Sequence, residues 1–115
     1  MPFSRGDVVL VLYPDSNLRT AKRRPAIVVQ ADQLQTGLPQ VVLAMISSNP
    51  FRTGHPSRVQ ILQSSAEGKQ MGLRTDSIVM TDNLATVLEG EIDRVIGRMP
   101  STGALDDALR HTLGL

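Results

Sequence analysis

The feature that most restricts the fold is a succession of short apolar segments that continues as far as Pro100. Proline, glycine or polar turn formers separate these segments. The segments are rich in Val, Ile and Leu, and such runs between turn signals are typical of β-strands. Strands are therefore expected at 7–13, 26–31, 40–47, 57–62 and 77–80, with further short strands at 85–88 and 95–97.

The connections between these segments are rich in turn formers. Segment 14–25 is polar and is expected to be a loop. Pro25 cannot donate a hydrogen bond to a β-ladder, which places it at the start of the second strand. Segment 49–56 contains two prolines and one glycine and is expected to be a loop, and 67–72 is expected to be a turn.

The periodicity changes after Pro100. Ser101 can cap a helix over 101–113, in which apolar residues recur at three- and four-residue spacing. Several short strands followed by one terminal helix imply a mainly β fold, a small and strongly bent barrel with a C-terminal α-helix. A chain of 115 residues is expected to form one domain, residues 1–115.

The composition argues against several classes of function. The chain has no cysteine, so it has no disulfide framework and no thiolate metal site. No carboxylate cluster or histidine pair stands out, and neither a metal nor a cofactor is expected. No segment approaches membrane-spanning length, and the first residues lack the apolar core of a signal peptide, so a cytoplasmic protein without a membrane partner is expected.

The formal net charge is only +1, but the charges are unevenly distributed. Residues 1–58 carry seven basic and three acidic side chains, whereas residues 59–115 carry five basic and eight acidic ones. This asymmetry can place a basic face beside an acidic one. Charge alone leaves a mixed, solvated surface as the alternative.

Three consecutive basic residues at 22–24 stand directly before the second strand, and Ser-Ser-Asn at 47–49 ends the third. Arginine binds phosphate through two parallel hydrogen bonds and keeps its charge at any working pH. Guanidinium groups at one strand and hydroxyls at the end of another can form a small anion site, so phosphate is the first ligand class to consider. The alternatives are solvated arginines and serines that end a strand as turn formers.

Five motifs stand along the chain in the order Arg5-Gly6-Asp7-Val8-Val9-Leu10-Val11, Lys22-Arg23-Arg24-Pro25-Ala26-Ile27-Val28-Val29, Ile46-Ser47-Ser48-Asn49, Gly72-Leu73 and Ser77-Ile78-Val79-Met80-Thr81-Asp82-Asn83-Leu84. Together they resemble the MazF/PemK family of toxins, and the resemblance extends from Arg5 to about Met99. It implies an SH3-like barrel of the CcdB/MazF kind, a homodimer, and a metal-independent endoribonuclease that cuts single-stranded RNA. It also implies a cognate antitoxin protein that blocks the cleft, with operator DNA bound only through the antitoxin complex.

The resemblance assigns roles by position. The family's catalytic arginine, directly before the strand proline, corresponds to Arg24, and its catalytic Thr or Ser at the end of the third strand corresponds to Ser47. Asn83 stands where many members place a Gln that touches RNA. Two departures are visible: the first loop lacks the Gly-Ser-Glu-Gln-like run of the best-studied branch, and Ala85-Thr86 replaces a common Arg-Thr pair.

Further RNA contacts are expected around these positions. Lys22 and Arg23 would bind phosphates without selecting sequence. Strand register leaves open whether Ser47 or Ser48 faces the phosphate. His55 is a candidate base or RNA contact, with an ordinary loop residue as the alternative, and Asp82-Asn83 is alternatively a plain turn. The remaining candidates for RNA contact, after the third strand, are Asn49, Phe51 and Arg52.

The expected reaction is a transesterification in which the 2′-hydroxyl attacks the adjacent phosphate, leaving a 2′,3′-cyclic phosphate (or 3′-phosphate) and a 5′-hydroxyl. Arg24 and Ser47 would stabilise charge on the phosphorane. Ordinary Arg and Ser side chains do not titrate near neutrality, so the general acid and base stay unassigned. Two other functions remain open: a non-catalytic toxin of the same fold that poisons DNA gyrase, and an antitoxin-binding module without nuclease activity.

Overall fold

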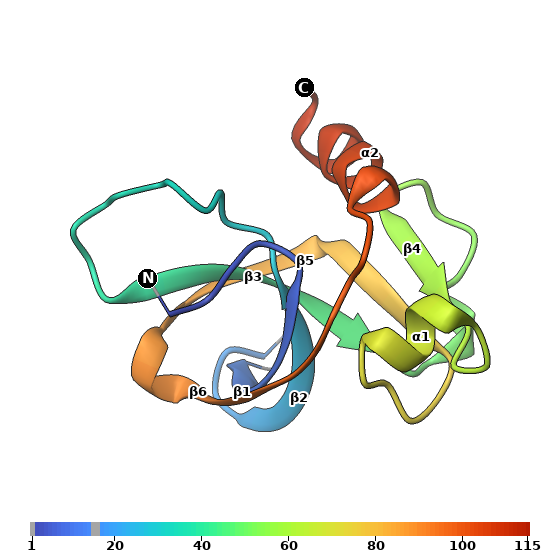
Figure 1. Ribbon diagram of the computed structural model, residues 1–115, viewed down its shortest axis with the longest axis horizontal. Helices are drawn as coiled ribbons and strands as arrows, with labels where there is room; N and C mark the ends of the chain where they lie inside the picture. The colour runs from blue at the N-terminus through green and yellow to red at the C-terminus, as the bar shows by residue number, and fades with distance from the viewer. Residues whose placement is uncertain (1, 15–16) are drawn as a thin grey trace.

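The computed structural model describes residues 2–14 and 17–115, and its main feature is one curved, six-stranded antiparallel sheet in the order β4-β5-β3-β2-β1-β6 (Figure 1). The mainly β fold with a C-terminal helix is confirmed, although β4 and β6 are edges that do not pair with one another. The elements are β1 (Asp7–Pro14), β2 (Ala21–Val28), β3 (Gln40–Ser47), η1 (Pro50–Arg52), β4 (Arg58–Ile61), α1 (Ala66–Gln70), β5 (Ser77–Leu88), η2 (Glu89–Glu91), β6 (Ile92–Arg98) and α2 (Gly103–Leu113).

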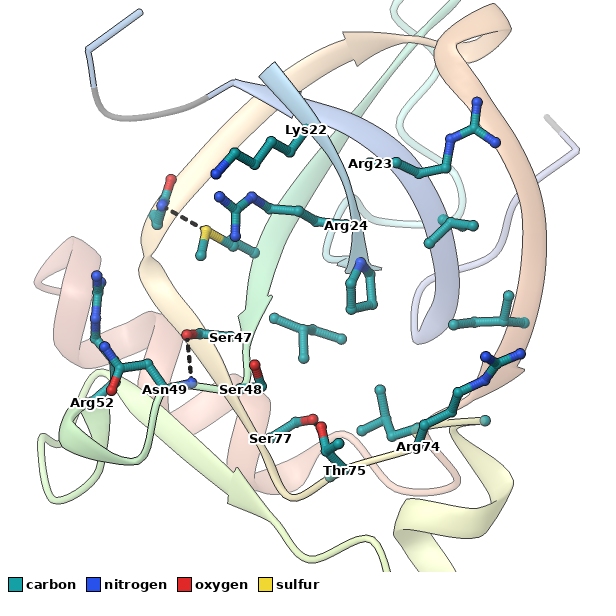
Figure 2. A pocket seen from close by; sticks show the side chains of 18 of the residues that line it. Lys22, Arg23, Arg24, Ser47, Ser48, Asn49, Arg52, Arg74, Thr75 and Ser77 are labelled. Atoms are coloured by element: carbon teal, nitrogen blue, oxygen red, sulfur yellow. Dashed lines mark hydrogen bonds between the residues drawn. The ribbon is translucent and has the colours of Figure 1, made fainter. Parts of the chain in front are cut away.

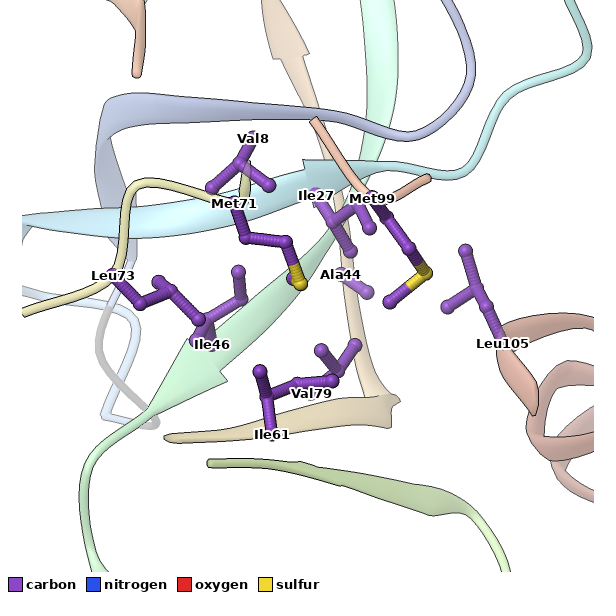
Figure 3. Packing of buried hydrophobic residues seen from close by; sticks show 10 residues of the cluster. All are labelled: Val8, Ile27, Ala44, Ile46, Ile61, Met71, Leu73, Val79, Met99 and Leu105. Carbon is purple, nitrogen blue, oxygen red and sulfur yellow. The ribbon is translucent and has the colours of Figure 1, made fainter. Parts of the chain in front are cut away.

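The sheet has a buried cluster on each face, because neighbouring residues of a strand point to opposite sides. On β3, Ala44 and Ile46 belong to one cluster, whereas Leu43 and Met45 belong to the other. Figure 3 shows the first cluster, in which Leu105 of α2 joins residues of the strands. The helix α2 thereby covers β4 and β5. None of the helices among the described residues has the length and apolar character needed to cross a membrane.

The second strand begins earlier than predicted and ends earlier, at Val28. Pro25 lies inside β2 rather than at its start, opposite Leu10 of β1. This position is tolerated because β2 pairs with β3 only over residues 26–28, so Pro25 has no β3 partner and its missing N–H interrupts no β2–β3 bond. The first half of β2 therefore diverges from β3.

The two strands predicted at 77–80 and 85–88 are the halves of one strand, β5. Its register against β3 jumps from Met45↔Met80 to Ala44↔Leu84, so residues 81–83 bulge out of the ladder. Bulges of this kind bend a strand and raise its twist. The reading of Asp82-Asn83 as a plain turn is therefore wrong: both lie within a bent strand.

Three predictions about turns and caps are corrected. The turn expected at 67–72 contains the short helix α1, because the Ser65 hydroxyl accepts a hydrogen bond from the N–H of Gly68 at 3.0 Å and caps it. The loop at 49–56 includes one 3₁₀ turn, η1. The helix α2 starts at Gly103, and its N-cap residue is Thr102 rather than Ser101.

The segment after α1 packs against β6 with almost no space between the backbones. A Cβ on Gly97 would overlap the backbone of Met71, and a Cβ on Gly72 would overlap the carbonyl group of Ile96. Gly72 also has a φ of +72°, which side-chain-bearing residues rarely adopt. These two glycines fix the path of the chain from Met71 into β5.

Gly97→Ala should destabilise the protein by about 1–3 kcal/mol, the usual cost of forcing extra atoms into a packed interior. The added methyl would push the backbone at Met71 away from β6. Urea unfolding followed by circular dichroism would measure the change. Gly90→Ala is the matched control, because a Cβ there meets nothing within 4 Å; equal midpoints for the two variants would contradict this packing.

Candidate active site

A groove of about 1270 Å³ opens where β2 and β3 diverge (Figure 2). Its wall is formed by parts of β1, β2, β3, β5 and β6, together with the segments around η1 and after α1. The lining residues are Leu10, Asn17, Thr20, Lys22, Arg23, Arg24, Pro25, Met45, Ile46, Ser47, Ser48, Asn49, Arg52, Gly72, Leu73, Arg74, Thr75, Ser77, Asn83, Arg94 and Ile96.

The groove is strongly cationic. Among the described residues that line it, no side chain is Asp or Glu. A cleft lined by charges of one sign focuses its field and concentrates counter-ions. This lining suits an extended polyanion better than a neutral ligand. Its basic residues are Lys22, Arg23, Arg24, Arg52, Arg74 and Arg94.

Two carboxylates on the bordering strands are paired with arginines. Asp82 of β5 accepts hydrogen bonds from Arg58 Nε at 3.3 Å and Nη2 at 2.8 Å. These bonds hold the pKa of the Asp82 carboxyl below its usual value, so Asp82 stays ionised and bound to Arg58. Asp93 of β6 forms ion pairs with Arg23 at 3.4 Å and Arg94 at 3.1 Å.

Strand register places Arg24 and Ser47 on the same side of the sheet. The last β2–β3 pair before the divergence is Ala26↔Met45. Arg24 and Ser47 each lie two residues beyond this pair on their own strands, so both share the face of Met45. Figure 2 shows the cationic ends of Lys22 and Arg24 directed toward the side of the opening where Ser47 lies.

The hydroxyl of Ser47 is held in place by the chain that follows it. Ser47 is only 7% exposed, and its Oγ accepts a hydrogen bond from the N–H of Asn49 at 3.1 Å. The hydroxyl proton is not used in that bond and can be donated to an anion in the groove. Ser48 lies beyond the end of β3 and is exposed.

Asn83 lies in the β5 bulge and is fixed from two directions. Its Nδ2 donates to Met45 Sδ at 3.1 Å, and its backbone carbonyl accepts a hydrogen bond from the Tyr13 hydroxyl at 2.6 Å. Burial raises the pKa of Tyr13, which therefore remains a protonated donor. The bulge thus presents Asn83 at the wall of the groove.

The structure brings eight of the ten sequence-predicted site residues to the groove, and two lie outside it. Phe51 is 92% exposed on η1 and does not line the groove. His55 points elsewhere: its Nδ1 accepts from the N–H of Ser57 at 3.1 Å, and its ring meets His111 edge to face. The eight are Lys22, Arg23, Arg24, Ser47, Ser48, Asn49, Arg52 and Asn83.

Sequence reasoning missed six polar residues of the groove, namely Asn17, Thr20, Arg74, Thr75, Ser77 and Arg94. Arg74, Thr75 and Ser77 follow the Gly72-Leu73 motif, and Arg94 stands beside Asp93. An arginine immediately after one of the motifs that carry the family resemblance is the signal that could have identified Arg74. Arg94 offered no comparable signal, because its position depends on the pairing of β6 with β1.

Comparison with known proteins places residues 4–111 within a family described as PemK-like, MazF-like toxins of type II toxin–antitoxin systems. The chain is 29% identical to endoribonuclease MazF2 of Mycobacterium bovis and to endoribonuclease MazF6 of Mycobacterium tuberculosis, with both chains covered completely in each case. Its fold is similar to that of a mycobacterial endoribonuclease solved in complex with its cognate antitoxin. That likeness has a TM-score of 0.73 at 20% identity and covers 98% of this chain and 96% of the other.

Proposed function

The chain belongs to the PemK-like, MazF-like toxins of type II toxin–antitoxin systems, and we propose that it is an endoribonuclease that cleaves single-stranded RNA in the cationic groove. One observation carries this proposal: Arg24 and Ser47 lie at corresponding positions of two diverging strands, on one face, in a groove that no described carboxylate lines. The relatives named as endoribonucleases support the same activity.

The substrate supplies most of the reaction. The 2′-oxygen of the nucleotide before the scissile bond attacks phosphorus and loses its proton, and the bond to the 5′-oxygen breaks as that oxygen gains a proton. The products are a 2′,3′-cyclic phosphate, which water can open to a 3′-phosphate, and a 5′-hydroxyl. The protein has to align the attacking and leaving oxygens and stabilise the charge that builds up on phosphorus.

Arg24 and Ser47 suit these tasks. The Arg24 guanidinium would donate to non-bridging oxygens of the phosphorane through parallel N–H groups. Ser47, whose oxygen is fixed by Asn49, would donate its hydroxyl proton to the same phosphate. The described lining contains no His, Asp or Glu, so we assign the proton transfers to no side chain and attribute the protein's contribution to positioning and charge stabilisation.

An antitoxin protein is the proposed protein partner, and it would bind the same groove as RNA. A related mycobacterial endoribonuclease has been solved with its cognate antitoxin. We propose that an acidic segment of an antitoxin occupies this groove and excludes RNA, because both ligands present anionic groups to the same cations. The protein would act as a homodimer in the cytoplasm, where its RNA substrates are found, and would meet operator DNA only through the antitoxin.

The proposed activity can be tested with purified protein, a long transcript and excess EDTA. Cleavage is expected to persist, because the proposed mechanism places charge stabilisation on Arg24 and Ser47 rather than on a metal ion. Sequencing of the new ends should find 5′-hydroxyl groups opposite 2′,3′-cyclic phosphates. Loss of cleavage in EDTA with recovery on adding a divalent ion would refute this mechanism, and an intact transcript under all conditions would favour a non-catalytic toxin or binding module.

Arg24→Ala is expected to lower single-turnover RNA cleavage by at least two orders of magnitude, in line with the loss of one preorganised donor at a developing charge, about 2.7–4 kcal/mol. Urea unfolding should change little, because the side chain lies at an opening rather than in the core. Arg98→Ala, which removes an arginine paired with Asp7 away from the groove, is the control and should cleave normally. Normal cleavage by Arg24→Ala would remove this residue from the mechanism.

Ser47→Ala should reduce the rate of the chemical step more than Ser48→Ala does, because Ser47 shares the face of Arg24 whereas Ser48 lies beyond the strand end. Single-turnover rates at saturating protein would compare the two variants without interference from RNA binding. Ser47→Thr keeps the hydroxyl and should retain most of the rate. The opposite order for the two alanine variants would exchange the assignments.

A further inference from the structure

We infer that the groove contains a second phosphate-binding subsite at Arg74, which binds a phosphate flanking the scissile one. This inference rests on the proposed function and extends it to the path of the RNA chain. The subsite is distinct from the cluster of Lys22, Arg24 and Arg52 around Ser47. Arg74 is the residue on which its test depends.

The two sets of cations lie on different sides of the opening. Figure 2 shows Arg23 and Arg74 across the opening from Lys22, Arg24 and Arg52, at opposite ends of that side. On β2 this separation follows from strand geometry, because Arg23 alternates with its two basic neighbours and points to the opposite face. One phosphate therefore cannot use all the cations of the groove.

Carboxylates balance the arginines on the side of Arg23 and Arg74 only in part. The Asp93 carboxylate is shared between Arg23 at 3.4 Å and Arg94 at 3.1 Å, so one negative charge faces two positive ones. Within the part of the chain that the structure describes, Arg74 forms no hydrogen bond or ion pair, although it is exposed to the groove. No described carboxylate balances the charge of Arg74, so a phosphodiester can balance it.

The backbone that carries Arg74 is held firmly. Leu73, its neighbour, is 7% exposed and belongs to the core cluster. Gly72 and Gly97 let the segment after α1 lie directly against β6, so a bulkier residue at either position would displace it. Arg74 therefore extends from a fixed point, which lowers the entropy cost of ordering its side chain around a ligand.

The part of the groove lining contributed by β1, β2, β6 and the segment after α1 includes apolar side chains as well as cations. A single-stranded RNA alternates charged phosphates with bases whose faces are apolar, and such bases are commonly bound on flat or apolar surfaces beside a cationic track. Cations on two sides of the opening and an apolar lining can therefore hold an unstacked base as well as the phosphates beside it. The apolar residues are Leu10, Pro25, Leu73 and Ile96.

The test measures binding of an oligonucleotide that spans a mapped cleavage site and carries 2′-deoxyribose at the scissile nucleotide, so that it cannot be cut. For single-stranded nucleic acid, the logarithm of the binding constant falls linearly with the logarithm of the salt concentration. Each lost phosphate contact makes this slope less steep by about 0.7. Arg74→Ala should show this loss, and Arg74→Lys should restore the wild-type slope. Arg110→Ala, which removes an arginine on α2 outside the groove, should leave the slope unchanged.

A second measurement separates a subsite from a general effect of charge. A minimal oligonucleotide without phosphates on either side of the scissile one should bind wild type and Arg74→Ala equally. A version of the longer oligonucleotide that lacks the base beside the scissile phosphate should bind the wild-type protein more weakly. The second subsite would be overturned if Arg74→Ala had the same slope as Arg110→Ala, or if its binding defect persisted on the minimal oligonucleotide. In either case, RNA cleavage by the wild-type protein would leave the proposed function intact.

The other outcomes are also distinct. If wild type neither binds nor cuts RNA, the proposed function fails and the subsite fails with it. If Arg74→Ala binds RNA normally but loses affinity for an acidic antitoxin peptide, the arginines serve the partner protein rather than RNA, which also overturns the inference. Unfolding midpoints of Arg74→Ala and wild type should agree, because Arg74 has no partner among the described residues.

Discussion

The separation of two neighbouring strands at Pro25 is the constraint on which the rest of the site depends. β2 and β3 pair over only three residues, and the ladder stops where proline offers no N–H for the next position. Beyond that point β2 stays with β1, and β3 stays with β5. Arg24 and Ser47, which a continued ladder would have placed opposite one another, instead face a shared opening.

A nuclease needs affinity for RNA and accurate placement of its catalytic groups, and different features of the groove serve these two requirements. In the proposed function, affinity for RNA would come from cations distributed over several elements, and it would not require any of them to be placed accurately. The proposed catalysis requires accurate placement, and two hydrogen bonds fix groups at the groove: Asn49 donates to Ser47, and Tyr13 donates to the carbonyl of Asn83. Arg58 and Arg23 contribute by binding the carboxylates of the bordering strands, which would otherwise weaken the field of the groove.

Much of this could be predicted from local pattern, and the failures share a cause. The third strand was predicted with its observed ends, because a continuous apolar run between turn formers is a local signal. Pro25 inside β2 was missed because its cost depends on which strand lies beside it. The unbroken β5 and the position of Arg74 were missed because a bulge and a glycine contact are set by tertiary partners, which a single sequence does not reveal.

The hydrogen bond from Tyr13 to the carbonyl of Asn83 has a practical consequence. The chain contains one tyrosine and no tryptophan, so its intrinsic ultraviolet emission originates almost entirely from a buried phenol that touches the groove wall. This phenol therefore lies next to the β5 bulge, at the part of the groove wall that a bound ligand would contact. Whether a ligand in the groove changes the emission of this single chromophore can be measured without attaching a dye.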